Sequence, residues 1–174
     1  WMPAVEYEGI PEWDVLIPGQ WQADWLQRRH DALSLLSEGF VVAWAGTPGG
    51  DGLPPGCLAL PFADPVRELP ALVAKSACVL GVDYTHAIDG YWSDRSWLLM
   101  GMGAAYIRRP TGCFPPGPYA QFCTDDELFE QVQTFRQHLN ERAMLGASAR
   151  AWVMAYHTYE KRCEQFLKAI EAMR

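Results

Sequence analysis

Short runs of apolar residues alternate along the chain with longer segments that have a helical pattern. The first run, Trp13 to Ile17, ends at Pro18-Gly19, and its length and turn-forming end favour a buried strand. The segment from Trp21 to Ser37 places apolar residues partly on one helical face and ends at Glu38-Gly39, as a helix stop does. The chain is therefore expected to begin with a strand, a glycine turn and a helix.

The same alternation continues through the middle of the chain. Further strands are predicted at Phe40 to Ala45, Cys57 to Leu60, Ala77 to Val82, Ala104 to Ile107 and Tyr119 to Cys123. Helices are predicted from Val66 to Lys75 and from an N-cap at Ser93 to about Gly101. Strands that alternate with helices predict an α/β fold, a Rossmann-like doubly wound parallel sheet with helices on both faces.

The last third of the chain is predicted to be helical. Thr124 is a good N-cap, and three acidic residues follow it in the first turn, where they complement the helix dipole. Two more helices are expected, roughly Glu141 to Tyr156 and Thr158 to Met173. We therefore expect a single domain over residues 1–174, with a helical C-terminal extension at about 124–174.

Composition excludes several classes of protein. Apolar residues make up 49% of the 174 residues, so disorder is excluded, and the net charge of −7 gives no footprint for nucleic acid. No apolar run is long enough to cross a membrane, and the first residues lack the basic, apolar and small-residue order of a signal peptide, so we expect a cytoplasmic protein. The five cysteines lack C-x-x-C spacing, so neither disulfides nor a metal site are predicted. The chain begins with Trp1, so a cut domain and a processed product both stay open.

In a doubly wound sheet, ligands bind beyond the carboxyl ends of the strands, where helix N-termini offer N–H groups to anions. Gly19 and Gln20 follow the first strand and could let the backbone approach a phosphate, with Arg28 and Arg29 near the start of the next helix. The alternative is a plain strand-to-helix turn with solvated arginines. No G-x-G-x-x-G motif or Walker lysine is present, which disfavours the dinucleotide and P-loop classes.

A second candidate loop, Asp83 to Arg95, follows a buried strand and opens a helix. Gly90 to Asp94 would aim backbone N–H groups at an anion that Arg95 could clamp. The side chains that could contact a sugar or base are Asp83, Tyr84, His86, Tyr91 and Trp92. In the alternative, Ser93 is only a helix cap, Trp92 and Trp97 are core aromatics, Arg95 pairs with Asp94 or Asp89, and His86 is solvated.

Several segments resemble group 1, CgeB-like glycosyltransferases, in the same order along the chain. The closing element His157-Thr158-Tyr159-Glu160-Lys161-Arg162 is similar to that family's last helices. Gly90-Tyr91-Trp92-Ser93-Asp94-Arg95, followed by Gly101-x-Gly103, looks like its central segment. Asp126-Glu127-Leu128-Phe129 resembles the acidic start of the next helix, and Asp14 to Gly19 resembles the family's first strand.

The resemblance implies the C-terminal, donor-binding half of a GT-B enzyme, which holds a nucleoside-diphosphate sugar while a separate N-terminal domain holds the acceptor. The sugar would be transferred without a metal, and the nucleotide sugar is a co-substrate rather than a cofactor. The residues expected at the donor's diphosphate are Gly19, Gln20, Arg29, Gly90, Ser93, Asp94 and Arg95. His86 is a weak candidate for a catalytic base.

The sequence departs from the family pattern at one informative position. Many group 1 enzymes have a ribose-binding glutamate where this chain has Leu98. Catalytic groups and the acceptor site of GT-B enzymes come largely from the N-terminal domain, so this chain alone could bind a donor without transferring it. Two alternatives therefore stay open: a non-catalytic nucleotide-binding or protein-interaction module, and a structural remnant within a larger assembly.

Overall fold

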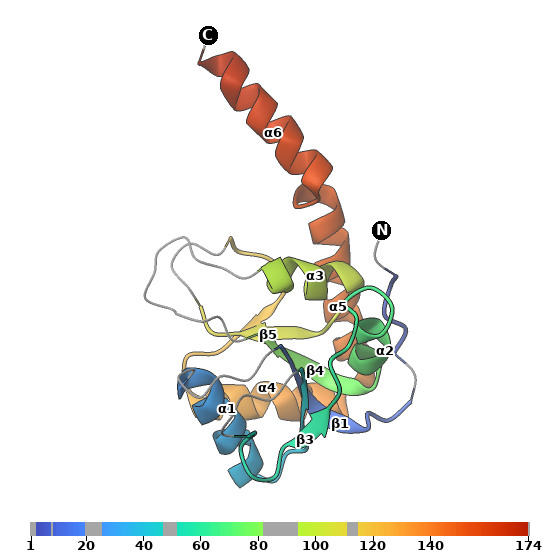
Figure 1. The fold of residues 1–174 in the computed structure, drawn as a ribbon, viewed down its shortest axis with the longest axis vertical. Coiled ribbons are helices and arrows are strands. Elements are labelled where there is room, and N and C mark those ends of the chain that lie inside the picture. The colour runs from blue at the N-terminus through green and yellow to red at the C-terminus, as the bar shows by residue number, and fades with distance from the viewer. Residues whose placement is uncertain are drawn as a thin grey trace.

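The computed structural model describes residues 3–7, 9–19, 26–46, 52–81, 94–110 and 115–173. The elements within these ranges are β1 (Trp13–Pro18), α1 (Leu26–Ser37), β2 (Val42–Ala45), β3 (Leu58–Leu60), α2 (Leu69–Ala74), β4 (Ser76–Gly81), α3 (Asp94–Met102), β5 (Tyr106–Arg108), β6 (Ala120–Gln121), α4 (Asp125–Gln137), α5 (Leu139–Tyr156) and α6 (Tyr159–Ala172). Figure 1 shows them along the chain from blue to red.

The strands form one sheet in the order β3-β2-β1-β4-β5-β6, and each neighbouring pair is parallel. The chain starts at β1 in the middle, winds outward to β3, and returns to β4 on the other side of β1. The direction of winding therefore reverses between β1 and β4, which makes this pair the topological switch point. The predicted doubly wound parallel sheet is confirmed.

Helices cover both faces of this sheet, and two apolar clusters fill the space beneath them. α1 and α4 contribute Leu35 and Leu128 to the cluster on one face, where they pack with Val15 of β1. The cluster on the opposite face contains Leu16 of β1 together with apolar residues of α2, α3 and α5. Every residue of β1 is buried, as expected for a central strand covered on both sides.

Local capping explains where several elements begin and end. Thr124 and Glu127 form a capping box at the start of α4, which confirms the predicted cap. α1 ends at Ser37, and Gly39 follows with a φ of +82°, as the helix-stop prediction requires.

The helix predicted to begin at Val66 begins later in the structure. The Asp64 carboxylate accepts the backbone N–H groups of Val66 and Arg67, and this turn delays the start of α2 to Leu69.

Two glycines allow α3 and α5 to meet closely. A Cβ on Gly146 of α5 would overlap the carbonyl oxygen of Gly103, which follows α3. Gly103 itself has a φ of +93°, a conformation that favours glycine. The side chain of Arg150 donates to the carbonyl of Gly101 at the same crossing. These contacts hold α5 against α3, the helix that begins near the switch point.

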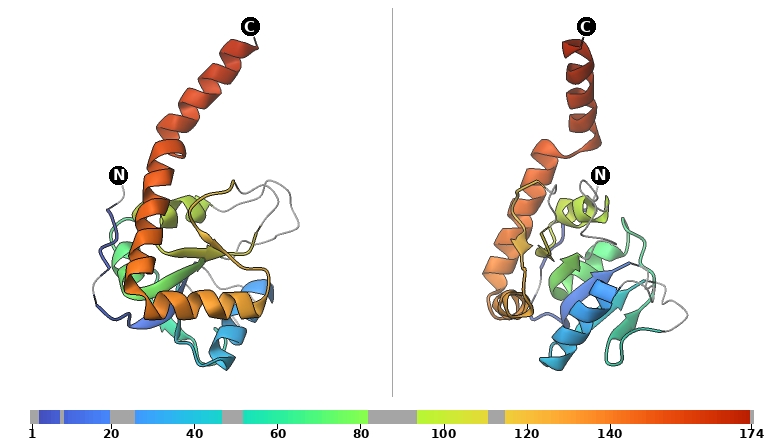
Figure 2. Two further views of the ribbon diagram at one scale, coloured as in Figure 1. Left: turned by 180° about the vertical axis from the view of Figure 1, so that it is seen from behind. Right: turned by 90° about the vertical axis from the view of Figure 1, so that its left-hand side faces the viewer.

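α6 extends away from the body of the protein. It follows α5 after a bend and carries the C-terminus far from the sheet (Figures 1 and 2). Thr158 caps it by accepting the backbone N–H of Lys161, close to the predicted start. None of its residues is buried. In the described part of the chain, no helix is both long and apolar enough to cross a membrane.

Candidate functional site

The turn after β1 is fixed by contacts with β2. The backbone N–H of Gly19 donates to the carbonyl of Ala45 (2.7 Å), and the indole Nε1 of Trp44 donates to the carbonyl of Gly19 (2.7 Å). Gly19 has a φ of +126°, which residues with a Cβ rarely adopt. Trp44 is fully buried, so its ring holds the turn rigidly at the carboxyl end of the sheet.

The start of α3 meets this turn. A Cβ built on Gly19 would lie only 2.6 Å from Nη1 and 2.7 Å from Cζ of Arg95, so the guanidinium lies against the Cα of Gly19. Arg95 is the second residue of α3, whose chain segment comes from the end of β4. The turn after β1 and the first turn of α3 thus meet at the switch point between β1 and β4. Ligand binding by this pair stays a prediction.

The two arginines at the start of α1 differ in burial, and the one predicted to contact phosphate is not the buried one. Arg29, the predicted phosphate contact, is half-buried, whereas Arg28 is 3% exposed. The Cζ of Arg28 lies 5.8 Å from the centroid of the Trp44 ring that holds the Gly19 turn. Helical spacing could have identified Arg28, because Ala32 and Leu35 lie four and seven positions later on the same buried face.

Two further arginines at this edge were missed by sequence reasoning. Arg108 ends β5 and is 1% exposed, and its Nε donates to the carbonyl of Arg109 (3.1 Å). Arg109 follows the strand, and its Cζ lies 4.6 Å from the centroid of the Phe122 ring. The strand predicted from the sequence ends at Ile107, and neither arginine was given a role. Their signal is that a charged pair directly follows a buried parallel strand, at the edge where ligands bind.

Arg109 also joins two helices through carboxylates. Its Nη2 donates to Asp31 of α1 (2.8 Å) and to Asp125 of α4 (3.3 Å). Burial lowers the pKa of Arg109, but the hydrogen bond and charge of Asp31 and the charge of Asp125 outweigh this and raise the pKa overall. Arg109 therefore stays charged and ties α1 to α4.

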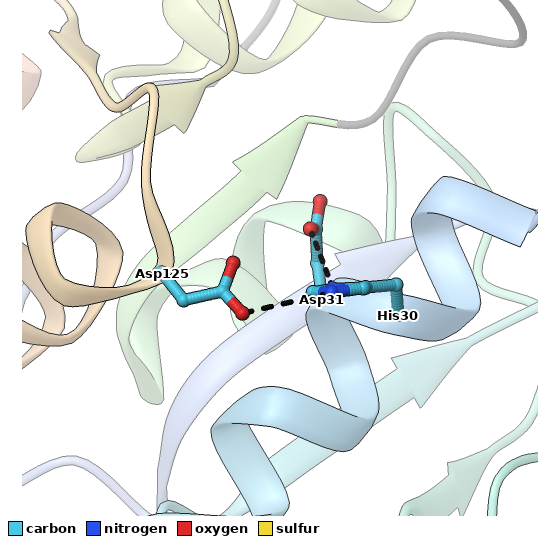
Figure 3. Close-up of side chains that lie close together, drawn as sticks. All are labelled: His30, Asp31 and Asp125. Carbon is cyan, nitrogen blue, oxygen red and sulfur yellow. Dashed lines mark ion pairs between the residues drawn. The ribbon is translucent and has the colours of Figure 1, made fainter.

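His30, Asp31 and Asp125 form the one group of three metal-ligand side chains in the part of the chain that the structure describes. The His30 ring nitrogens lie 3.8 Å from Asp31 and 3.7 Å from Asp125 (Figure 3). The Arg109 guanidinium contacts both carboxylates and neutralises their charge, as a bound metal ion would. The arrangement acts as an ion-pair network between α1 and α4, and the prediction of no metal site is not tested by it.

Several predicted site residues lie outside the described residues, and their places stay predictions. These are Gln20, Asp83, Tyr84, His86, Gly90, Tyr91, Trp92 and Ser93, together with the side chain of Asp94. The proposed pairing of Arg95 with Asp94 or Asp89 therefore also lies outside them. Of the predicted donor-site residues, the structure describes Gly19, Arg29 and Arg95, and it brings Gly19 and Arg95 into contact.

The His157-Thr158-Tyr159 element lies at the bend between α5 and α6. The His157 ring stacks on Trp97 of α3, with ring centroids 4.2 Å apart, and packs against Trp152 of α5 at 4.3 Å. The Cζ of Arg162 lies 5.1 Å from the centroid of Trp97. Burial and the charge of Arg162 both lower the pKa of His157. Trp97 is 9% exposed, which agrees with the alternative that treats it as a core aromatic.

Known proteins share this architecture. T4 phage BGT is similar in a mutant complex with UDP-glucose (TM-score 0.61, 9% identity, 85% of this chain and 45% of that chain). The DNA modifying enzyme beta-glucosyltransferase, solved with and without uridine diphosphoglucose, is also similar (TM-score 0.61, 11% identity, 85% of this chain and 48% of that chain). T4 phage BGT with UDP and Mn²⁺ matches with a TM-score of 0.59 and 8% identity, over 87% of this chain and 45% of that chain.

Identities this low show the fold alone, and the chain spans less than half the length of these structures. No curated protein sequence matches the chain. The family comparison is more extensive, because the profile of the glycosyl transferase-like family matches residues 11–168. Within the described residues, this range includes all strands and all helices except the end of α6. The chain belongs to the glycosyl transferase-like family.

Proposed function

We propose that the chain is the donor-binding domain of a GT-B, CgeB-like glycosyltransferase, and that it binds a nucleoside-diphosphate sugar at the carboxyl edge of β1 and β4. The contact between Gly19 and Arg95 is the observation that carries this proposal. It places a guanidinium and a glycine turn together at the switch point, where ligands of doubly wound folds bind. Family membership and the shared fold support the same conclusion.

The distribution of positive charge supports a phosphate-bearing ligand. The chain carries a net charge of −7, yet four arginines other than the carboxylate-paired Arg109 come from segments that end or begin at this edge of the sheet: Arg28, Arg29, Arg95 and Arg108. Guanidinium groups suit phosphate oxygens because they donate two hydrogen bonds in a fixed planar geometry. The first turn of α3 adds backbone N–H groups that favour an anion.

The chemistry of such a domain is stabilisation of the leaving group. During transfer, an acceptor hydroxyl oxygen bonds to the anomeric carbon and gives its proton to a base, while the bond between that carbon and the diphosphate oxygen breaks and leaves its electron pair on the diphosphate. Arg95 and the N–H groups of α3 would stabilise the charge that develops there, and such electrostatic stabilisation is commonly the largest contribution to catalysis. In this proposal the arginines take the role that a metal ion could play. His86 stays a candidate base.

A separate acceptor domain, in the same polypeptide or a partner chain, would complete the site. α6 offers a surface for it, because Tyr159, Cys163, Phe166 and Leu167 form an exposed apolar strip around a shallow hollow. Tyr159 is 84% exposed and Phe166 66% exposed, although both are large apolar side chains. An apolar strip of this kind marks an interaction surface more often than a solvated one.

One observation favours a second candidate, a nucleotide-binding module without transferase activity. Leu98, at the position of the family's ribose-binding glutamate, is half-buried and packs against the apolar cluster beneath α3. It offers no hydrogen bond to a ribose hydroxyl. A domain that has lost this contact could retain diphosphate binding through Arg95 while it no longer positions a donor for transfer.

Calorimetric titration of the purified chain tests the proposal. Uridine, guanosine and thymidine diphosphates and their sugars form the panel, and at least one is expected to bind with 1:1 stoichiometry. Arg95→Met should weaken that binding by at least about tenfold, because 1.4 kcal/mol already corresponds to a factor of ten. Lys168→Met, which removes an equal charge from the exposed side of α6, is the control and should bind as the wild type does.

Failure of the whole panel to bind would contradict the proposal. Binding without donor hydrolysis or transfer, even when an acceptor domain is supplied, would favour the second candidate.

A further inference from the structure

A buried hydroxyl pair lies directly beneath the start of α3. The phenol oxygen of Tyr106 in β5 lies 2.7 Å from Oγ of Ser96 in α3, and Tyr106 and Ser96 are 1% and 0% exposed. The Tyr106 ring reaches across the end of β4, where a Cβ on Gly81 would overlap its hydroxyl. Glycine at the last position of β4 is therefore what lets the phenol reach α3.

This hydrogen bond connects the sheet to the residue next to Arg95. Ser96 follows Arg95 in the first turn of α3, so the two side chains leave the helix about 100° apart. Ser96 points to the sheet and Arg95 contacts Gly19. A bond that fixes Ser96 against Tyr106 sets the rotation of this turn about the helix axis, and with it the direction of the Arg95 side chain.

Packing alone already holds α3 on the sheet. Leu99 and Met100 are fully buried in the cluster on this face, and α3 also packs against α5. Apolar contacts attract without strong directional preference, whereas a hydrogen bond specifies an orientation. The hydroxyl pair is thus a directional feature of the contact between α3 and the sheet, and it can help to define where Arg95 points.

We propose that Tyr106 and Ser96 are positioning residues, which hold the Arg95 guanidinium against Gly19 in the orientation that receives the diphosphate. This inference rests on the proposed function, and it adds residues to the site that touch no ligand themselves. They act through Arg95, so their effect should be confined to ligands that carry the phosphates that Arg95 contacts.

Tyr106→Phe tests this, because it removes one hydroxyl and keeps the ring. The nucleoside diphosphate that the wild type binds should lose roughly fivefold in affinity, the effect of one net hydrogen bond, while affinity for the parent nucleoside stays unchanged. Ser96→Ala should behave in the same way. In an Arg95→Met background, Tyr106→Phe should cause no further loss, since both changes act on one contact.

A ligand-independent readout separates this inference from the proposed function. The Arg95 Nε–H resonance in ¹⁵N-resolved NMR, assigned with Arg95→Lys, should shift or broaden in Tyr106→Phe, whereas a merely structural role of the hydroxyl pair would lower the thermal midpoint and leave this resonance unchanged. An unchanged resonance, an unchanged diphosphate affinity or an undiminished loss in the Arg95→Met background would overturn the positioning role. A wild-type chain that binds no nucleoside diphosphate would overturn the proposed function, and the resonance would still report on Tyr106.

Discussion

The guanidinium of Arg95 lies against the Cα of Gly19, so that the turn after β1 and the first turn of α3 share one contact. The residues are 76 positions apart in sequence and meet because β1 and β4 are neighbours in a parallel sheet. Residues that follow adjacent parallel strands emerge at the same edge. The chemistry proposed for this protein depends on that meeting.

Gly19→Ala should abolish most diphosphate binding. Its new Cβ would displace the Arg95 guanidinium, and a φ of +126° is strained for alanine. Affinity should fall by at least about tenfold in a calorimetric titration. Gly39→Ala is the matched control, because Gly39 also has a positive φ but a Cβ there meets no atom within 4 Å. Equal affinities of the two variants would argue against the role of the contact.

The ion pair between Asp31 and Arg109 should contribute strongly to stability. The Asp31 side chain is completely buried and that of Arg109 is 17% exposed. Asp31→Asn therefore leaves the largely buried Arg109 charge with only the Asp125 carboxylate to balance it. We expect the free energy of unfolding in urea to fall by about 2–4 kcal/mol. Glu164→Gln breaks an exposed pair with Lys161 and should change it by about 0.5 kcal/mol or less. Similar losses in both variants would contradict this account.

His157 should make the protein less stable in mild acid. Burial and Arg162 lower its pKa in the folded state, so below pH about 6.5 the unfolded chain binds the proton first. The free energy of unfolding therefore falls as the pH drops through this range. Urea midpoints at pH 7.5 and 5.5 measure the change, which should be smaller in His157→Gln. Parallel pH dependences in the two proteins would show that His157 does not contribute.

The sequence was sufficient for the fold because its signals are local. Buried strands such as β1 are continuous apolar runs, and Thr124 and Gly39 mark helix ends by their own chemistry. The start of α2 could not be predicted in this way. It depends on whether Asp64 forms a turn with Val66 and Arg67, and that side-chain choice competes with an otherwise reasonable helix.

The candidate site was only partly predictable for a different reason. Gly19 stands out because it lies in a turn directly after a strand. Arg95 stands out because it lies where a helix opens after another strand. Arg28 and Tyr106 acquire their roles from partners that lie on other elements of the fold, Trp44 for Arg28 and Ser96 for Tyr106. A single sequence does not reveal such pairs, since neither partner forms a motif with its own neighbours.

Hydrogen exchange of individual backbone amides, with and without a nucleoside diphosphate from the binding panel, tests the central claim most directly. The account predicts added protection at Gly19 and in the first turn of α3, with none at the amino ends of β1 and β4 on the far side of the sheet. Protection confined to another surface, with both turns unchanged at saturating ligand, would contradict it.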